Sequence, residues 1–147
     1  MKTPSTPVDL LDVNVWLALA DENHQHHRRA RLYWETESAL RLAFCRVTML
    51  GLLRLATNTK VMSGQPFSPQ EAWRAYRAFR ELPEVEMLTD PPKLESTLAT
   101  WTEQSHFTAK SWTDGYLAAL AFSTNSRLVS FDADFHHYKG LSFLHLQ

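Results

Sequence analysis

The sequence predicts a single α/β domain in which a mostly parallel central sheet is flanked by helices. Short apolar segments typical of buried strands alternate along the chain with segments of helical periodicity. The 147 residues, 44% hydrophobic and 21% charged, have the size and composition of one globular domain spanning 1–147. No internal repeat, low-complexity tract or long linker divides this domain.

Two strands and three helices are expected before residue 58. Val8–Asp12 and Leu40–Cys45 are short apolar runs of the kind that form buried parallel strands. Asn14–Ala20 has the pattern of the first turns of a helix directly after the first strand. Helices are also expected at His24–Glu37, where apolar residues share one face, and at Thr48–Thr57, which is rich in leucine.

A helix start signal follows the loop of residues 58–67. Ser68 is a candidate N-cap, Pro69 occupies the first helical position, and Glu71 completes a capping box. The helix that follows separates aromatic residues on one side from arginines on another: Trp73, Tyr76, Phe79 and Arg74, Arg77, Arg80. By this spacing Trp73 is expected in the core, like Trp34 in the earlier helix.

The last third of the chain continues the alternation of strands and helices. A short strand at Val85–Leu88 precedes a helix at about Pro91–Ser105, which Asp90 is expected to cap. Another helix is expected at about Ser111–Thr124. Two strands complete the sheet: Arg127–Phe131 and Leu141–Leu146. Such alternation implies crossover connections and hence parallel pairing.

Aspartates recur at one edge of this predicted sheet. Asp12 ends the first strand, while Asp132 follows a later strand and Asp134 lies two residues beyond it. Asp114 lies in the first turn of the helix that Ser111 opens. Ligands of open α/β sheets bind outside the carboxyl ends of the strands, beside helix N-termini. We therefore expect these carboxylates to converge in one crevice.

A cluster of carboxylates is electrostatically unfavourable unless a cation compensates it, because like charges raise one another's pKa. Oxygen-only ligands of this charge density suit Mg²⁺ or Mn²⁺. Such a metal stabilises charge on phosphate oxygens and lowers the pKa of an attacking water. The cluster therefore indicates phosphodiester cleavage.

Each aspartate also has a plausible structural role. Asp114 fits a Ser-x-x-Asp capping box with Ser111, and Asp12 is suited to cap the helix after the first strand. Asp132 and Asp134 are suited to cap a short turn. For any one aspartate, capping explains its position at least as well as metal binding does. Aspartates at three equivalent positions of one sheet edge are less easily explained by capping alone, and they favour a metal-binding cluster.

The net charge of −1 conceals an uneven distribution. Residues 21–80 carry ten Lys or Arg and five acidic residues, whereas residues 81–147 carry four and nine. Nine of the ten arginines lie between Arg28 and Arg80. This asymmetry is typical of a nucleic-acid surface beside an acidic centre, and equally of solvated helix faces.

The remaining composition limits the class of protein. Cys45 is the only cysteine, which excludes an internal disulfide and a cysteine-based zinc cluster, and we expect it in the core. The histidines at positions 24, 26 and 27 are expected on a solvated surface. No apolar run reaches about 18 residues, and the polar N-terminus lacks a signal-peptide core. We therefore expect a cytoplasmic protein without membrane association.

Five segments, in order along the chain, resemble a PIN-domain ribonuclease, in particular the VapC-type toxins of bacterial toxin–antitoxin pairs. They span nearly the whole sequence: Leu10–Leu19, His24–Trp34, Val47–Asn58, Trp112–Ala121 and Leu128–Phe135. The resemblance implies a PIN-like fold and a metal-dependent endoribonuclease. In these terms Asp12, Asp114 and Asp132 are the catalytic residues that bind Mg²⁺ or Mn²⁺, and Asp134 is a further ligand.

One position departs from the family pattern. Many PIN nucleases carry a glutamate about three residues before the arginine that matches Arg54, but here that position is Gly51. The remaining acids are expected to hold one metal ion more readily than two.

The resemblance also implies partners and supporting residues. The chain is expected to form a homodimer, to cleave RNA, and to be inhibited by a small VapB-like antitoxin. We expect Asn14 to be a supporting residue that hydrogen-bonds a ligand carboxylate or the attacking water. Arg46 and Arg54 are candidates for binding substrate phosphates or for holding an acidic residue in place. For Arg54, a buried ion pair with a purely structural role is an alternative.

Two other functions are compatible with parts of the pattern. The first alternative is a catalytically impaired PIN-like module, which lacks the usual glutamate and binds RNA or an antitoxin without cleavage. Phosphoryl transfer through an aspartate, as in haloacid-dehalogenase-like or receiver domains, requires an Asp-x-Asp pair and a lysine near the last strand. Asp12-Val13-Asn14 does not supply that pair, so this function ranks low.

Overall fold

A computed structural model describes residues 6–147, with a five-stranded parallel sheet at its centre. The strand order is β3-β2-β1-β4-β5. The strands are β1 (Val8–Leu11), β2 (Arg41–Phe44), β3 (Val85–Met87), β4 (Arg127–Ser130) and β5 (Phe143–His145). The α/β class is confirmed, and each strand ends one residue earlier than predicted.

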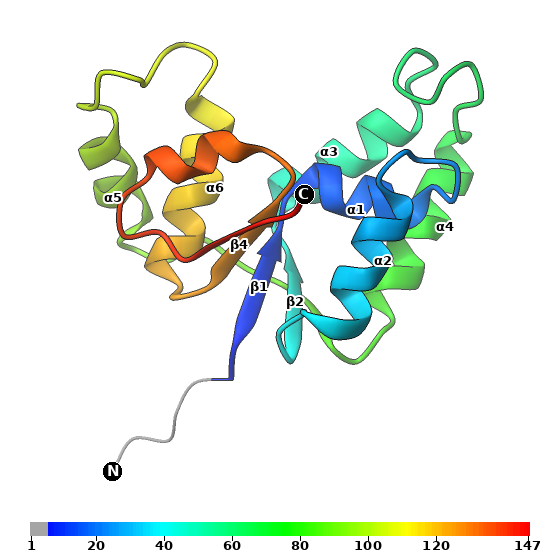
Figure 1. The fold of residues 1–147 in the computed structure, drawn as a ribbon, viewed down its shortest axis with the longest axis horizontal. Coiled ribbons are helices and arrows are strands. Elements are labelled where there is room, and N and C mark those ends of the chain that lie inside the picture. Colours follow the sequence, from blue (N-terminus) through cyan, green and yellow to red (C-terminus); the bar gives the residue numbers. More distant parts are fainter. Residues whose placement is uncertain (1–5) are drawn as a thin grey trace.

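Helices cover both faces of the sheet (Figure 1). They are α1 (Val13–Ala20), α2 (His27–Thr36), α3 (Arg46–Ala56), α4 (Pro69–Arg80), α5 (Leu94–Trp101) and α6 (Trp112–Ser123), with a 3₁₀ helix, η1, at Ala133–His137. Helices α5 and α6 lie on one side, and α1 to α4 on the other (Figure 1). No helix within residues 6–147 is long and apolar enough to cross a membrane.

The predicted start of α4 is confirmed in detail. Ser68 Oγ accepts a hydrogen bond from the Glu71 backbone N–H at 3.1 Å. Glu71 Oε1 accepts one from the Ser68 N–H at 2.9 Å, which completes the capping box. Pro69 is the first helical residue, where its missing N–H has no partner to lose.

The predicted cap of α5 is wrong. The helix begins at Leu94 after Lys93, four residues beyond Asp90, and ends at Trp101 rather than near Ser105. Asp90 Oδ1 instead accepts a hydrogen bond from the Tyr116 hydroxyl at 2.6 Å. This contact ties the end of β3 to α6, a long-range partner that the local capping pattern did not reveal.

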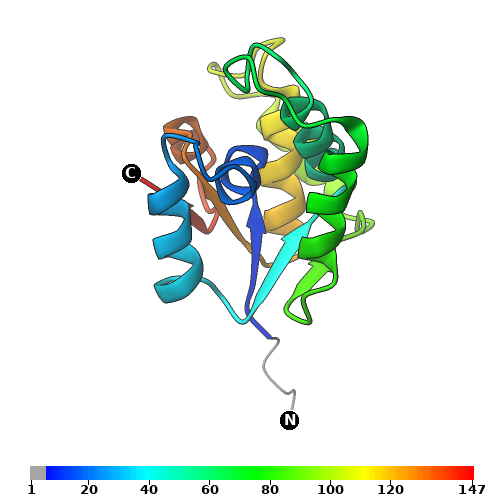
Figure 2. The same ribbon diagram turned by 90° about the vertical axis from the view of Figure 1, so that its right-hand side faces the viewer.

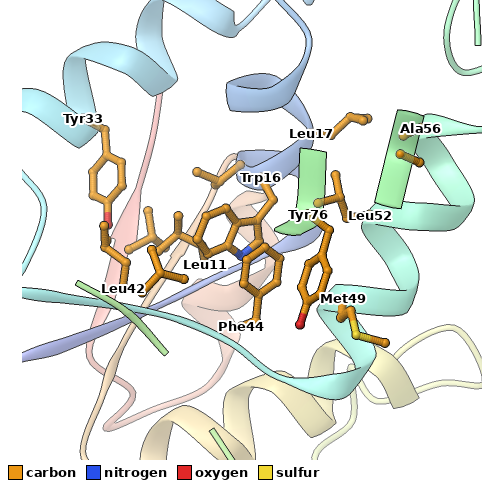
Figure 3. Packing of buried hydrophobic residues seen from close by; sticks show 14 of the residues in the cluster. Leu11, Trp16, Leu17, Tyr33, Leu42, Phe44, Met49, Leu52, Ala56 and Tyr76 are labelled. Atoms are coloured by element: carbon orange, nitrogen blue, oxygen red, sulfur yellow. The ribbon is translucent and has the colours of Figure 1, made fainter. Parts of the chain in front are cut away.

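Two apolar clusters pack against the two faces of the sheet. On the α1–α4 face, fully buried Trp16 stacks on Phe44 with ring centroids 3.8 Å apart and an interplanar angle of 7° (Figure 3). Tyr76 of α4 closes against Phe44 edge-on (Figure 3). The other cluster includes fully buried Cys45, as expected.

Trp73 contradicts its predicted place in the core, because its side chain is 46% exposed. Tyr76, three residues later, is 4% exposed and takes the inward position. The core side of α4 is therefore narrower than the aromatic spacing indicated. Trp73 and the neighbouring arginines lie toward solvent.

A buried ionic network closes the amino-terminal edge of the sheet. Asp9 is 1% exposed, and its carboxylate accepts hydrogen bonds from Arg127 Nε at 2.9 Å and Nη2 at 2.8 Å. The Tyr33 hydroxyl and the Ala39 backbone N–H also donate to Asp9 Oδ2. The network joins β1, β4 and α2 on the side opposite the predicted site. Figure 2 shows β1 and β2 pointing toward the same end of the sheet.

Candidate functional site

Asp12 lies where β1 turns into α1, and it makes two kinds of contact. As the N-cap residue, its Oδ1 accepts a hydrogen bond from the Val13 N–H at 2.7 Å, so the predicted capping role is confirmed. Its Oδ2 accepts one from Ser130 Oγ at 2.7 Å. The residue is only 9% exposed, so capping alone leaves its second oxygen buried and directed to β4.

Ser130 connects the polar groups of the site, and the sequence argument did not single it out. Its hydroxyl has one proton, which the short contact assigns to Asp12 Oδ2. Its oxygen then accepts from Asn14 Nδ2 at 3.1 Å and from the Asp132 N–H at 3.0 Å. Asn14 is thus coupled to the Asp12 carboxylate through Ser130. The Phe131 N–H also donates to Asn14 Oδ1 at 3.3 Å.

Asp132 and Asp134 belong to the turn after β4. Asp132 is the N-cap of η1, and its Oδ1 accepts a hydrogen bond from the Asp134 N–H at 2.9 Å. The predicted capping role of Asp132 is confirmed. Asp134 lies in the first turn of η1 and is exposed. Asp132 is half-buried beside Ser130, whereas Asp134 occupies the outer rim of the site.

Asp114 lies in the first turn of α6, which starts at the carboxyl edge of the sheet (Figure 1). The Ser111 side chain caps no N–H of this helix and accepts instead from the Thr108 N–H at 3.0 Å. The capping-box alternative for Asp114 is therefore wrong. With that role removed, its half-buried carboxylate faces the other aspartates.

The four carboxylates influence one another electrostatically. Burial raises the pKa of Asp114 to about 6, and the negative charges of Asp12, Asp132 and Asp134 contribute to that rise. Burial also raises the pKa of Asp12, with Asp132 adding to the effect and the hydrogen bonds from Ser130 and Val13 opposing it. The topology thus places the four predicted aspartates within electrostatic reach of one another at the carboxyl edge of the sheet.

The donor chemistry of this cluster fits a hard divalent cation. None of the four aspartates forms an ion pair with Lys, Arg or His in the described part of the chain. Within residues 6–147, no three His, Cys, Asp or Glu side chains are already arranged to share one ion. Burial is the main cause of the raised pKa values of Asp12 and Asp114, and the uncompensated negative charge of neighbouring aspartates adds to it. Carboxylate-bound Mg²⁺ or Mn²⁺ would neutralise that charge.

Gly51 is explained by close packing between α3 and α1. A Cβ atom built on Gly51 would lie 2.6 Å from Cγ2 of Val13, the residue directly after Asp12. Val13 is β-branched and stiff at χ1, so it yields little room. A glutamate at position 51 would therefore require α1 or the Val13 side chain to move, and the site forms without that acid.

The two predicted substrate-binding arginines occupy different ends of α3. Arg46 is the first residue of the helix, directly after the carboxyl end of β2, and it is exposed. Arg54 lies in the last turn, exposed, and borders a hollow with Leu50 and Trp73. Since Arg54 forms no ion pair within the described residues, the buried-pair alternative is wrong.

The histidine-rich segment at the start of α2 packs more closely than predicted. His24, His26 and His27 are all half-buried rather than freely solvated. The His26 ring stacks on Phe131, with centroids 4.6 Å apart, and His27 Nδ1 lies 2.7 Å from the Ala18 carbonyl oxygen. This segment therefore supports the one that carries Asp132.

The parallel sheet, with helices on both faces and aspartates at its carboxyl edge, defines an α/β domain with an acidic site at the ends of its strands. The chain belongs to the PIN domain family, whose model matches residues 10–141. It is 37% identical to Ribonuclease VapC41 of Mycobacterium tuberculosis over 137 residues. The aligned region covers 90% of this chain and 94% of that protein. Ribonuclease VapC38 of the same organism is 34% identical over 127 residues, or 84% of each chain. The resemblance drawn from the sequence is confirmed.

Solved structures support the same fold at lower sequence identity. VapC20 of M. tuberculosis, described as a sarcin-ricin loop cleaving toxin, superposes with a TM-score of 0.67 at 18% identity, covering 89% of this chain and 95% of that one. VapBC-1 from nontypeable Haemophilus influenzae gives a TM-score of 0.67 at 17% identity, with 94% and 97% coverage. The PIN-like fold class is thereby confirmed.

Proposed function

We propose that this protein is a VapC-type toxin that cleaves RNA and is neutralised by a cognate VapB-like antitoxin. The observation that carries the proposal is the convergence of four aspartates in a chain 37% identical to a VapC ribonuclease. The acidic cluster supports metal-assisted cleavage, and the names of the relatives support RNA as the substrate class. The VapBC structures among the neighbours support an antitoxin partner. We also propose a cytoplasmic location, since that is where the RNA substrate would be met.

Asp12, Asp114 and Asp132 would hold Mg²⁺ or Mn²⁺, with Asp134 as a further ligand at the rim. When bound, such a cation stabilises negative charge on the phosphate oxygens and lowers the pKa of a coordinated water. Ser130 and Asn14 keep the Asp12 carboxylate oriented. Arg46 and Arg54 would contact substrate phosphates, and a homodimer is the assembly that we propose.

The decisive experiment is cleavage of RNA with Mg²⁺ or Mn²⁺ by the wild type and by Asp12→Asn and Asp114→Asn. We expect both variants to lose cleavage while Glu103→Gln, which removes an exposed charge outside the site, remains active. Cleavage retained in both aspartate variants would refute the mechanism.

A binding module without cleavage is the second candidate, because Val13 occupies the space that a glutamate at position 51 would need. Calorimetry separates the two functions. Mg²⁺ uptake by the protein alone supports the nuclease. Tight partner binding without Mg²⁺ uptake or cleavage supports the module.

A further inference from the structure

A basic pocket of about 400 Å³ lies between the start of α3 and the outer side of α4. Its charged and aromatic lining is Arg46, Arg77, Arg80, Trp73, Tyr76 and Glu81. Three guanidinium groups therefore share the pocket with one carboxylate. Trp73, Arg77 and Arg80 have no part in the proposed chemistry at the aspartates, and none of them belongs to the buried core.

The arginines of the basic pocket have unused hydrogen-bonding capacity. None of the three forms an ion pair in the part of the chain that the structure describes. Arg80 Nη1 donates to the Tyr76 hydroxyl at 2.8 Å, which fixes the guanidinium, while its buried Nε–H has no partner. Three guanidinium groups that form no ion pair within residues 6–147 make the pocket suited to an anionic ligand. Arginine is the side chain that best matches phosphate oxygens.

Trp73 adds an aromatic surface to the same pocket. Its side chain is 46% exposed, and its ring lies 5.4 Å from that of buried Tyr76 at an angle of 42°. An exposed tryptophan beside guanidinium groups is the combination on which nucleic-acid bases stack. Stacking tolerates any base, because every base presents a π-face.

The basic pocket begins next to the aspartate cluster. Strands β1 and β2 pair in parallel with Leu10 opposite Ala43, so continuing this register places Asp12 opposite Cys45. Arg46 follows directly and opens α3. Neighbouring strands lie about 4.8 Å apart, so the backbone at Arg46 is close to that at Asp12. One polynucleotide strand is thus able to pass from the aspartates into the pocket.

We infer that the basic pocket is a subsite for single-stranded RNA, in which Trp73 stacks on a base and Arg46, Arg77 and Arg80 contact phosphates. The inference rests on the proposed ribonuclease function, and it identifies the surface next to the aspartates that the substrate strand contacts. RNA fits better than an apolar peptide, because each nucleotide supplies both a phosphate and an aromatic ring. The subsite adds affinity without sequence selectivity.

Fluorescence anisotropy with a short labelled single-stranded RNA of mixed sequence tests the subsite. The Asp12→Asn background prevents cleavage during the measurement. We expect Trp73→Ala to weaken binding roughly ten-fold, within the range known for base stacking, and Trp73→Phe to restore most of the affinity. Arg77→Ala should lower affinity and reduce the dependence of log K on log salt by about 0.7, the contribution of one phosphate contact.

Arg74→Ala is the matched control, since Arg74 is exposed on the same helix but does not line the basic pocket. Its affinity and salt dependence should equal those of the parent. Equal RNA binding by the Arg74, Arg77 and Trp73 variants would overturn the subsite. This holds also if analytical sedimentation shows that the substitutions change self-association of the protein, because RNA affinity would still be independent of the pocket. Pocket-dependent RNA binding by a wild-type chain that cleaves no RNA would uphold the subsite and refute the proposed nuclease.

Discussion

Ser130 Oγ lies 2.7 Å from Asp12 Oδ2, although the two residues are 118 positions apart in the chain. They meet because β1 and β4 pair in parallel with Leu11 opposite Val129, which puts the next residue of each strand side by side. The hydroxyl therefore satisfies one oxygen of a nearly buried carboxylate. It also holds Asn14 and the Asp132 backbone around that carboxylate.

Ser130→Ala should reduce RNA cleavage more than it reduces stability. The substitution leaves Asp12 Oδ2 without its donor and frees the Asn14 amide, so the carboxylate loses its fixed orientation. Groups that orient metal ligands typically change activity or metal affinity by about 10- to 100-fold when removed. Steady-state cleavage rates and Mg²⁺ calorimetry measure the loss.

Ser126→Ala is the control for that substitution. Ser126 is also buried, but it lies just before β4 at the opposite edge, where its hydroxyl contacts Thr124. It should cost about 1 kcal/mol of stability and leave the cleavage rate unchanged. If both serine variants cleave RNA equally well, Ser130 has no positioning role.

The fold was predictable because its main signals are local. Apolar periodicity and capping residues located every strand and α-helix, and parallel topology then placed Asp12, Asp114 and Asp132 at one edge. The elements that sequence reasoning placed wrongly depend on distant partners. The α5 cap failed because Asp90 bonds Tyr116 of another helix.

The site was less predictable than the fold. A serine at the end of a strand has no recognisable functional pattern of its own. The role of Ser130 appears only when the neighbouring strand brings Asp12 beside it. Trp73 has helical spacing identical to that of a core residue, and only the packing of Tyr76 shows that it faces outward. The absence of a side chain at Gly51 is similarly explained only by close contact with Val13 of another helix.

Gly51→Ala should destabilise the protein through its contact with Val13. Alanine gains about 1 kcal/mol of helix propensity over glycine. Overpacking by a methyl group costs about 1–3 kcal/mol, and here the new Cβ would lie 2.6 Å from Val13 Cγ2. We expect a net loss of about 1 kcal/mol in chemical denaturation.

The Val13→Ala, Gly51→Ala pair tests the cause of that loss. Removing both Val13 methyl groups leaves only its Cβ, 3.5 Å from the new atom, which is an ordinary contact. Gly51→Ala should then be neutral or stabilising in the Val13→Ala background. An identical loss in both backgrounds would show that the contact is not responsible.

Asp9→Asn should be among the most destabilising single substitutions in the chain. It removes the charge that pairs with Arg127 in a site where Asp9 is nearly inaccessible. Removing one partner of a buried pair typically costs about 3–5 kcal/mol. Tyr33→Phe, which removes one hydrogen bond to the same carboxylate, should cost about 1.5–3 kcal/mol.

Glu35→Gln provides the comparison for Asp9. Its partner Arg31 lies one helical turn away, and both side chains are more than half exposed. Such pairs contribute about 0.3–0.5 kcal/mol, so urea midpoints should barely move. Equal effects at Asp9 and Glu35 would refute a structural role for the buried network.

The pH dependence of stability should carry the signature of the aspartate cluster. The pKa of Asp114 is about 6 in the folded protein against 3.8 ordinarily, so the folded state binds the proton more tightly. Asp114 and Asp12, whose pKa is also raised, therefore destabilise the metal-free fold as pH rises from about 4 to above 6. In EDTA, Asp114→Asn should gain stability over wild type across that window, on the order of 1 kcal/mol after solvent screening.

Mg²⁺ should reverse the ranking of these two proteins at pH 7. A ligand that binds only the folded state stabilises it by RT ln(1 + [L]/Kd), and the wild type retains the carboxylate that Asp114→Asn lacks. Protons compete for the same oxygens, so the gain in melting temperature on adding Mg²⁺ should be larger at pH 7 than at pH 5. Parallel pH profiles in EDTA, together with equal Mg²⁺ shifts for wild type and variant, would mean that Asp114 belongs to no cation site.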